Sequence, residues 1–341
     1  MDALARAFEL AALGPVYGPN PRVGCVITAP DGAPLGEGYH HGAGHPHAEV
    51  EALADAAAKG HDVTGATAWV TLEPCNHQGR TGPCSVALAE AGVAKVVYAM
   101  ADPNPVAGGG DACLRGHGVE TVAQANPTEA AELNQAWLFA VTHGRPLVTL
   151  KLATSLDGYI AGADGASRWI TGEPARAYAH AIRAQVDAIA VGTGTIYADD
   201  PALTARGGGG TLAEHQPLRV VVGHRPIPEG AAIGRAGAPP LHVATHDPAV
   251  VLAELQAREV RHLLVEGGAT LATAFLEAGL VDRLNLYLGA VLLGAGLKAI
   301  GPLGVTGLVD APRWVTRAVR QLGDDVLIDA AREAETCSPV W

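Results

Sequence analysis

Apolar residues recur along the chain in short blocks, and the spacing within each block separates helices from strands. Met1, Leu4, Phe8 and Ala11 follow the period of a helix. The first half also predicts strands over residues 23–27, 36–40, 66–72 and 95–100, and helices over residues 48–59, 83–91 and 127–142. Helices that alternate with strands predict an open, layered α/β sheet.

A domain boundary is expected near Gly144-Arg145-Pro146, because a helix ends there and an apolar strand begins at Leu147. The second half predicts strands over residues 147–152, 186–191, 218–222, 262–265 and 284–288, and a helix over residues 269–278. Four glycines at 207–210 indicate a mobile surface loop. At about 150 residues per domain, 341 residues agree with two domains, which we place at 1–144 and 145–341.

The charge balance, the apolar stretches and the cysteine count exclude several classes of protein. Lys and Arg number 23 against 35 Asp and Glu, so the net charge of -12 argues against a wide nucleic-acid surface. A small anionic substrate held by a few local basic groups remains possible. We expect no membrane helix, since no stretch of about 20 apolar residues occurs, and no export signal, since Asp2 and Glu9 stand where a basic region is needed. Five cysteines, an odd number, favour a reducing cytoplasm over a disulfide framework.

The first half carries a set of metal-binding residue types. His47, Cys75 and Cys84 offer one imidazole and two thiolates, which suit tetrahedral zinc and leave a fourth position for water. Zinc would lower the pKa of that water toward about 7. Glu49, two residues from His47, could pass the water proton to a leaving amine. This order is typical of zinc deaminases of nucleobases, although eight residues separate the two cysteines here instead of two.

Purely structural interpretations of these residues stay open. A fourth ligand from Asn76-His77, or from the neighbouring histidines, would close the zinc site, and the thiols could simply be buried. The neighbouring histidines are His40, His41 and His45. The remaining cysteines, Cys25, Cys113 and Cys337, are interpreted as ordinary small residues.

Longer motifs make the first half specific. It resembles the pyrimidine deaminase domain of bifunctional riboflavin biosynthesis proteins in Asn20-Pro-Arg-Val-Gly-Cys-Val-Ile, Gly36-Glu-Gly-Tyr-His40, Gly44-His-Pro-His47-Ala-Glu49-Val, Thr71-Leu-Glu-Pro-Cys75-Asn-His77-Gln-Gly-Arg-Thr-Gly-Pro-Cys84 and Asp102-Pro-Asn104-Pro. The resemblance implies that His47, Cys75 and Cys84 bind zinc and that Glu49 shuttles protons. It also implies that Asn20 and His40 line the substrate pocket, although a turn-capping Asn and a strand-end His are equally consistent with the residues alone. Gly82 departs from the Pro usual in the family.

The second half has glycine-rich turns where strands end. Val191-Gly-Thr-Gly-Thr195 and Val265-Glu-Gly-Gly-Ala-Thr270 would let a backbone approach a diphosphate, with helix N–H groups facing it. Ordinary strand-to-helix geometry needs glycine as well. The sequence shows no P-loop, no Ser-His-Asp arrangement and no clean G-x-G-x-x-G.

Further motifs resemble the reductase domain of the same bifunctional proteins, which is similar to dihydrofolate reductase in fold and uses NADPH. They are Arg145-Pro-Leu-Val-Thr-Leu-Lys151, Ser155-Leu-Asp157-Gly158, Ser167-Arg-Trp169-Ile-Thr171-Gly, Ala190-Val-Gly-Thr-Gly-Thr195, Asp199-Asp-Pro-Ala-Leu203-Thr-Ala-Arg206 and Val265-Glu266-Gly-Gly. The resemblance implies cofactor contacts from Ala153, Trp169, Thr195, Asp199, Gly268, Ala269, Thr270, Leu271, Ala272 and Thr273. It implies substrate contacts from Ser167, Arg183, Leu203, Arg206 and Glu266.

These roles are physically sensible, with a plainer alternative for several residues. Arg183 and Arg206 suit a phosphomonoester, but also a solvated helix face and a loop charge. Lys151, if it points inward, could polarise the sugar carbonyl and is a possible proton donor for the reduction; otherwise it marks a surface end of its strand. Glu266 follows a strand, where α/β sheets place ligand groups.

Two further positions bear on the second half. Asp157 could simply make a turn with Gly158. Gly223 stands where the family generally has Asp, which weakens any transfer of cofactor contacts to that stretch.

We therefore expect an α/β enzyme with a cytidine-deaminase-like zinc domain followed by a dihydrofolate-reductase-like domain. Its predicted cofactors are Zn²⁺ and NADPH. The resemblance implies deamination of 2,5-diamino-6-(5-phosphoribosylamino)pyrimidin-4-one, then reduction of the ribosyl side chain to ribityl. We expect a small phosphorylated pyrimidine as partner, no nucleic acid or membrane, and a homo-oligomer (a dimer or a tetramer). The competing hypotheses are a zinc-dependent RNA-base deaminase with an appended nucleotide-binding module, and a non-catalytic zinc-stapled scaffold.

Overall fold

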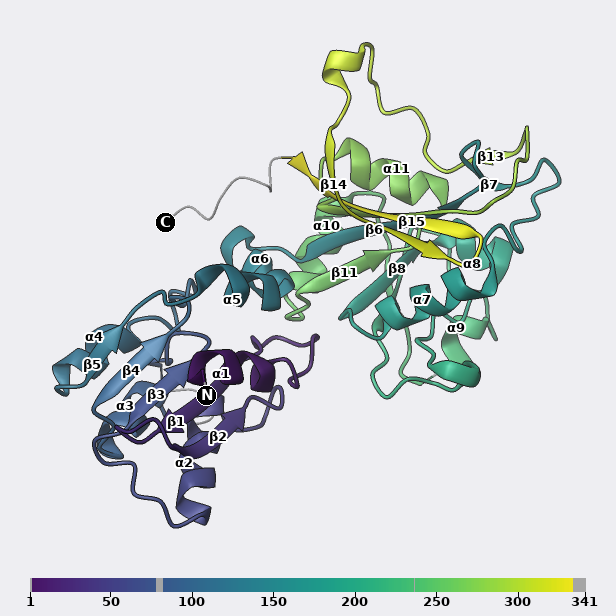
Figure 1. Cartoon of the computed structure of the whole chain (residues 1–341). Helices are drawn as coiled ribbons and strands as arrows, with labels where there is room; N and C mark the ends of the chain where they lie inside the picture. The colour runs from purple at the N-terminus through teal and green to yellow at the C-terminus, as the bar shows by residue number, and fades with distance from the viewer. Residues whose placement is uncertain (1, 78–81, 236, 334–341) are drawn as a thin grey trace. The chain divides into compact units, whose positions relative to one another are not determined.

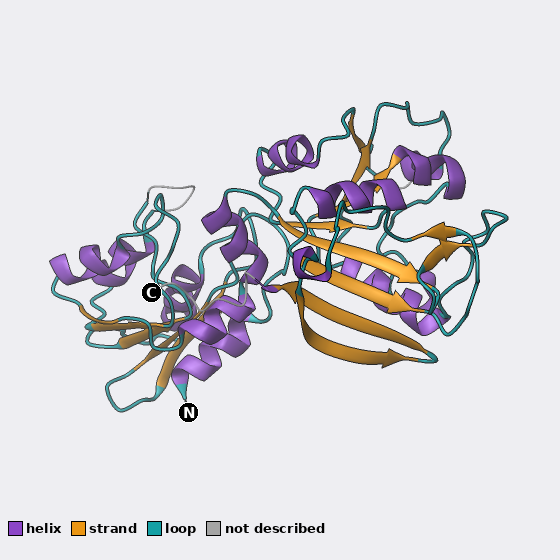
Figure 2. Cartoon of the chain, turned by 90° about the horizontal axis from the view of Figure 1, so that it is seen from above, coloured by secondary structure: helices purple, strands orange, loops and turns teal. Residues whose placement is uncertain are grey.

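The computed structural model describes residues 2–77, 82–235 and 237–333. The chain forms two compact units, Met1–Gly144 and Arg145–Trp341. Figure 1 traces the elements of each unit, and Figure 2 shows the helices packed against the strands. Among the described residues, no helix combines the length and the hydropathy that crossing a bilayer requires.

The first unit is built on a five-stranded sheet. Its order is β2 (Pro34–Tyr39), β1 (Gly24–Thr28), β3 (Thr67–Val70), β4 (Lys95–Tyr98) and β5 (Glu120–Val122). β1 pairs antiparallel with β2 and β3, while β3, β4 and β5 run parallel. The helices are α1 (Ala3–Ala11), α2 (Ala48–Ala58), α3 (Cys84–Glu90), α4 (Gly110–Gly116), α5 (Pro127–Leu133) and α6 (Gln135–His143).

Glycine and alanine bring β2 and α2 into close contact. A Cβ at Gly36 would lie 2.2 Å from the carbonyl oxygen of Ala52, and one at Gly38 would lie 2.5 Å from the Ala52 nitrogen. Only glycine at these two positions of β2 leaves room for the backbone of α2 to approach so closely. This close packing holds α2 against the sheet. The start of α2, which carries His47 and Glu49, is thereby fixed.

The single helix predicted over residues 127–142 is wrong, because the chain breaks at Asn134 into α5 and α6. The buried Asn134 side chain accepts a 2.7 Å hydrogen bond from the Arg22 backbone nitrogen and donates a 3.0 Å bond to the Arg22 carbonyl. These bonds satisfy the backbone N–H and carbonyl groups of a residue 112 positions away in the sequence. The helical apolar period continues across the break, which is why the period alone does not reveal it.

The second unit has an eight-stranded sheet. Its order is β10 (Leu241–Val243), β9 (Leu218–Val222), β8 (Ala188–Gly192), β11 (His262–Val265), β6 (Leu147–Thr154), β12 (Arg283–Leu288), β15 (Asp325–Arg332) and β14 (Trp314–Leu322). The first six strands are parallel. β15 pairs antiparallel with β12, and β14 pairs antiparallel with β15. A second small sheet pairs β13 (Leu297–Lys298) with β7 (Tyr159–Ala161).

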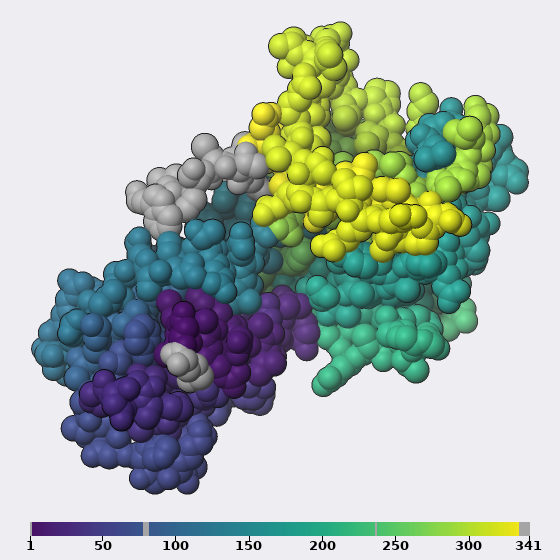
Figure 3. Space-filling model, viewed as in Figure 1, coloured from purple at the N-terminus to yellow at the C-terminus, as the bar shows by residue number. Residues whose placement is uncertain are grey.

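The helices of the second unit connect its parallel strands. They are α7 (Glu173–Arg183), α8 (Thr193–Asp199), α9 (Ala232–Arg235), α10 (Pro248–Gln256) and α11 (Ala269–Glu277), with 3-10 turns at Gly208–Gly210 and Leu308–Asp310. The β14–β15 hairpin lies at the surface, as its yellow atoms in Figure 3 show. The strand order makes β8, β11 and β6 neighbours, so their carboxyl ends meet where α/β sheets bind ligands.

Candidate active sites

Three metal-binding side chains converge in the first unit. His47 precedes α2, Cys84 begins α3, and Cys75 lies in the loop after β3. The His47 Nδ1 is 3.4 Å from the Cys75 Sγ and 3.3 Å from the Cys84 Sγ. All three candidate ligand atoms lie within 4.8 Å of one another. One imidazole and two thiolates at this separation fit a tetrahedral zinc ion with one further position.

The loop that carries Cys75 is tightly held. The Ser85 backbone donates to the Cys75 carbonyl at 3.2 Å, and the Ser85 hydroxyl donates to Asn76 at 2.9 Å. A Cβ on Gly110 would lie only 1.7 Å from the Pro74 carbonyl oxygen, so α4 packs directly on this loop. The motif residues 78–81, like Cys337, lie outside the described residues.

Proximity and burial alter the acidities of the cluster. Hydrogen bonding from Cys84, with a further contribution from His47, lowers the pKa of Cys75 to about 4 although burial opposes it. The contact with Cys75 raises the pKa of Cys84 above the usual thiol range. A thiolate is the form of cysteine that binds a metal, and Cys75 is therefore ready to do so.

Glu49 is buried in the first turn of α2, with 3% of its surface exposed. Burial, followed by the negative charge of Cys75, raises the pKa of this carboxyl to about 7. Among the described residues, the group of candidate ligands holds His47, Cys75 and Cys84 without Glu49. A carboxyl beside the ligands but outside that group has the position required of a proton carrier.

Asn20 and His40 lie next to the cluster. The His40 Nδ1 is 2.8 Å from the Pro46 carbonyl oxygen, so it carries the proton, and the Nε2 therefore accepts from the Asn20 amide at 2.8 Å. The His40 ring meets the His47 ring edge-on at 5.3 Å between centroids. Burial lowers the pKa of His40, which keeps the ring neutral and the Asn20 amide oriented.

The other histidines do not complete a closed site. Within the part of the chain that the structure describes, His77, His41 and His45 all fall outside the ligand group. His41 and His45 are exposed, with their ring centroids 5.9 Å apart. A fourth ligand from these residues is therefore not supported.

Glu73 is a structural carboxylate that the sequence analysis missed. It is buried and accepts hydrogen bonds from the backbone nitrogens of Asp102 at 3.2 Å and Asp111 at 2.9 Å. It thus anchors the Asp102-Pro-Asn-Pro turn and the start of α4 beside Cys75. An acidic residue in the otherwise apolar run before Pro74 was the available signal.

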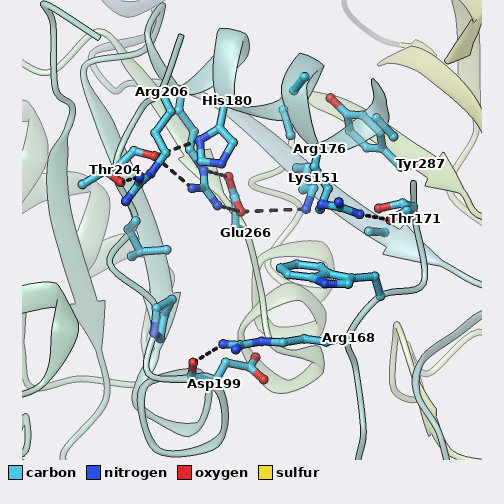
Figure 4. Close-up of a pocket in the computed structure, with 18 of the residues that line it drawn as sticks. Lys151, Arg168, Thr171, Arg176, His180, Asp199, Thr204, Arg206, Glu266 and Tyr287 are labelled. Atoms are coloured by element: carbon cyan, nitrogen blue, oxygen red, sulfur yellow. Dashed lines mark hydrogen bonds and ion pairs between the residues drawn. The ribbon is translucent and has the colours of Figure 1, made fainter. Parts of the chain in front are cut away.

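The second unit contains a cleft of about 900 Å³, and Figure 4 draws part of its lining. At its centre, Arg183 donates to Glu266 through its Nε at 2.6 Å and its Nη2 at 2.7 Å. The Lys151 Nζ lies 3.8 Å from the same carboxylate. Lys151 thus points into the cleft, and the interpretation of it as a surface strand end is wrong.

This triad is buried, and the Glu266 carboxylate stabilises both cations. Burial alone would raise the pKa of Glu266, but Arg183 and Lys151 outweigh that effect and lower it to about 2. Burial lowers the pKa of Lys151, with Glu266 partly opposing the change. Lys151 is consequently a better proton donor than an exposed lysine.

The loop after α8 forms one wall of the cleft. Leu203 is buried with a φ of 53°, a conformation that a non-glycine residue adopts only when its surroundings impose it. Arg206 donates to the Thr204 hydroxyl at 3.2 Å and to the Gly210 carbonyl at 3.1 Å. The four glycines at 207–210, predicted only as a mobile surface loop, also border the cleft, and Gly208–Gly210 form a 3-10 turn.

The other predicted residues divide into two groups. The cleft is lined by the five substrate residues predicted in the second half, and by Ala153, Trp169, Thr195, Asp199 and Gly268 of the predicted cofactor residues. Trp169 is 68% exposed and lies under the Arg176 guanidinium at 4.4 Å from its ring centroid. Ser167 donates to the Asp199 carboxylate at 3.1 Å, and the Gly268 nitrogen donates to the Thr195 hydroxyl at 3.0 Å.

The rest of the predicted turn, from Ala269 to Thr273, begins α11 and lies outside the lining residues. Leu271 and Ala272 are buried in the hydrophobic core. The Thr273 hydroxyl donates to Ala269 and accepts from the Gly301 nitrogen. Side-chain contact with a ligand is therefore not supported for these three residues, which leaves the backbone N–H groups at the start of α11 to face one.

Two further positions have structural explanations. The Asp157 carboxylate accepts from Ser155 at 2.6 Å and from the Gly294 nitrogen at 2.7 Å, so Asp157 joins the turn before Gly158 to a segment distant in sequence. Gly223 has a φ of 128°, and a Cβ there would lie 2.8 Å from the Thr193 hydroxyl. The local backbone thus favours glycine where the family generally has Asp.

Comparisons with known proteins find matches to both halves of the chain. Residues 2–100 match the family model of the cytidine and deoxycytidylate deaminase zinc-binding region, and residues 146–328 match the RibD C-terminal domain. The riboflavin biosynthesis protein RibD of Mycobacterium tuberculosis is 47% identical over 312 residues, which cover 91% of this chain and 90% of that protein. RibD of Escherichia coli is 41% identical over 362 residues, covering 95% and 97%.

Solved structures extend the similarity to the fold. A RibD structure from Acinetobacter baumannii has a TM-score of 0.87 and 37% identity, covering 97% of this chain and 98% of that one. The diaminohydroxyphosphoribosylaminopyrimidine deaminase/5-amino-6-(5-phosphoribosylamino)uracil reductase of Thermotoga maritima has a TM-score of 0.84 and 33% identity, with 97% of each chain covered. With a zinc-binding deaminase domain followed by a reductase domain, this chain belongs to the RibD family of bifunctional riboflavin biosynthesis enzymes.

Proposed function

We propose that the first unit removes the exocyclic 2-amine of 2,5-diamino-6-(5-phosphoribosylamino)pyrimidin-4-one, and that the second reduces the ribosyl group of the product with NADPH. The substrate is a small phosphorylated pyrimidine. The observation that carries the proposal is the presence of two separate reactive constellations, the His47–Cys75–Cys84 cluster with Glu49 and the Lys151–Glu266–Arg183 triad. The name of the Thermotoga maritima relative supports the same pair of reactions.

In the deaminase site, His47, Cys75 and Cys84 would hold zinc. Bound there, zinc supplies Lewis-acid chemistry that makes water reactive near neutral pH. Glu49 would accept a proton from the attacking water and donate it to the departing amine. The Asn20 amide, fixed by its bond to His40, orients the pyrimidine ring through its carbonyl oxygen.

In the reductase site, Trp169, Thr195, Asp199 and Gly268 would bind NADPH, with the amides at the start of α11 facing its diphosphate. NADPH supplies the hydride, and the protein aligns it with C1 of the sugar. Lys151 protonates the sugar oxygen as its bond to C1 breaks, a role that its burial favours.

The phosphate of the substrate needs a cation whose charge is available. Arg183 already forms a two-point ion pair with Glu266, whereas within the described part of the chain the Arg206 side chain donates only to neutral oxygens of Thr204 and Gly210. Arg206 therefore takes the phosphate, and Arg183 with Glu266, Ser167 and Leu203 shapes the rest of the substrate site.

Zinc analysis combined with two activity assays tests the proposal. The purified chain should contain about one zinc ion, release ammonia from the diaminopyrimidine, and oxidise NADPH with the deaminated intermediate. It should release no ammonia from RNA. A zinc-loaded chain that oxidises no NADPH with the deaminated intermediate would refute the reductase assignment.

A further inference from the structure

His180 lines the cleft of the second unit, and the sequence analysis assigned no role to it. It lies near the end of α7, where it is half-buried, and it borders the same cleft as Arg183 and Arg206. Figure 4 shows its ring beside Arg206 and Thr204 at one end of the cleft. This is the end at which the proposed function places the substrate phosphate.

One hydrogen bond determines the tautomer of the His180 ring. The Nδ1 lies 3.0 Å from the Thr204 carbonyl oxygen, and a carbonyl oxygen can only accept. The Nδ1 therefore carries a proton, and in the neutral ring the Nε2 is an acceptor. A phosphate dianion also offers only acceptors, so the two can bond only after the ring gains a second proton.

Thr204 joins the basic groups at this end of the cleft. Its carbonyl accepts from His180 and, at 3.1 Å, from the Arg183 Nη1, while its hydroxyl accepts from the Arg206 Nε. Thr204 is buried, with 4% of its surface exposed. The three side chains thus share a rigid anchor, and the ring of His180 is held in place rather than free to turn away.

We propose that His180 takes up a proton when the substrate phosphate binds and donates its Nε2–H to the phosphate, so that phosphate affinity falls as pH rises. This inference rests on the proposed function, which puts the phosphate at Arg206. It makes His180 a direct substrate contact and a pH-dependent part of the reductase site.

The charges around His180 define the direction of the effect. Burial and then the nearby Arg183 lower the pKa of the unliganded ring; Arg206 acts in the same sense, while the Thr204 carbonyl and Glu266 oppose them. A bound dianion raises that pKa. Below the pKa of the unliganded His180 ring, the ring is already charged and its affinity for phosphate is highest. As the pH rises above that value the affinity declines, and it levels off above the pKa of the ring in the phosphate complex.

Inorganic sulfate is a suitable probe because, unlike phosphate, it does not titrate near neutral pH. Its inhibition constant against the phosphorylated substrate is measured with the full chain between about pH 5 and 8, where a histidine changes charge. For the native chain the constant should rise by up to tenfold per pH unit. His180→Asn keeps an N–H near Thr204 but cannot titrate, and should bind sulfate about tenfold more weakly at the acidic end with no pH dependence.

Two variants make the result specific. His180→Gln should give the same flat profile if the Asn variant folds poorly. His242→Asn is the matched control, because His242 also bonds a backbone carbonyl, that of Gly223 at 2.7 Å, but lies outside the cleft lining. It should keep the native profile.

The outcomes separate the two proposals. If Arg206→Ala weakens sulfate binding while a folded His180 variant retains the native slope, the inference is overturned and the proposed function stands. If Arg206→Ala leaves sulfate binding unchanged, the phosphate is misplaced and both proposals fail. A flat profile only in the His180 variants supports the inference.

Discussion

Replacement of Glu266 by Gln tests how strongly the buried triad stabilises the second unit. The substitution keeps the shape of the side chain and removes its charge, so Arg183 and Lys151 lose their common partner. The carboxyl pKa falls from 4.5 to about 2 in the folded chain, which corresponds to about 3 kcal/mol of stability at neutral pH. A loss of that size agrees with the about 3–5 kcal/mol typical of a buried ion pair that loses one member.

The pH dependence follows from the direction of this shift. Because the folded state lowers the pKa of Glu266, the stabilisation is fully present above 4.5 and disappears as the pH falls toward about 2. The native chain and Glu266→Gln should therefore differ most near neutrality and converge in acid.

Calorimetric unfolding of the full chain measures the effect. For a unit of this size, a loss of about 3 kcal/mol lowers the transition of the second unit by about 6–12 °C. Glu254→Gln is the matched control, since Glu254 of α10 pairs at 2.7 Å with the exposed Arg258, which follows the helix, and should contribute less than about 0.5 kcal/mol. Similar transition temperatures for the two variants would refute the reasoning.

Three further substitutions test the two sites and the packing of α4. Cys75→Ser should lower zinc content and abolish ammonia release while NADPH oxidation with the deaminated intermediate persists; loss of both activities would contradict independent sites. Arg206→Ala should raise KM for the phosphorylated substrate by about tenfold or more and leave KM for NADPH unchanged; equal increases would count against the phosphate assignment. Gly110→Ala, whose Cβ would lie 1.7 Å from the Pro74 carbonyl oxygen, should destabilise the first unit by more than about 1 kcal/mol in denaturant titration. Gly116→Ala, in open space on the same helix, should be near neutral, and equal stabilities would refute the contact.

Strands that are buried along most of their length were predictable from sequence. The runs predicted at residues 218–222 and 262–265 coincide with β9 and β11, because Pro217 and Gly223 bound the first and the charged Arg261 and Glu266 bound the second. The β14–β15 hairpin was not predicted. Most of β14 is exposed, so its sequence lacks the apolar run that marks a buried strand.

The sequence predicts which residues form the candidate sites, but not which of their side chains contact one another. Motifs identify His47, Cys75 and Cys84 together because the order of these ligand types is itself informative. Arg183 and Glu266 are 83 residues apart, and no local pattern indicates that they form an ion pair. The break at Asn134 is likewise imposed by a partner distant in sequence.

The central claim is that the His47–Cys75–Cys84 cluster is a catalytic centre in which Glu49 carries protons. Ammonia release by Glu49→Gln, measured beside its zinc content, tests this most directly, with Glu51→Gln in the same helix turn as the charge-matched control. We predict that Glu49→Gln retains zinc and loses about 10²–10⁴-fold in deamination rate, while Glu51→Gln keeps both. A zinc-loaded Glu49→Gln chain that releases ammonia at the native rate would contradict the account.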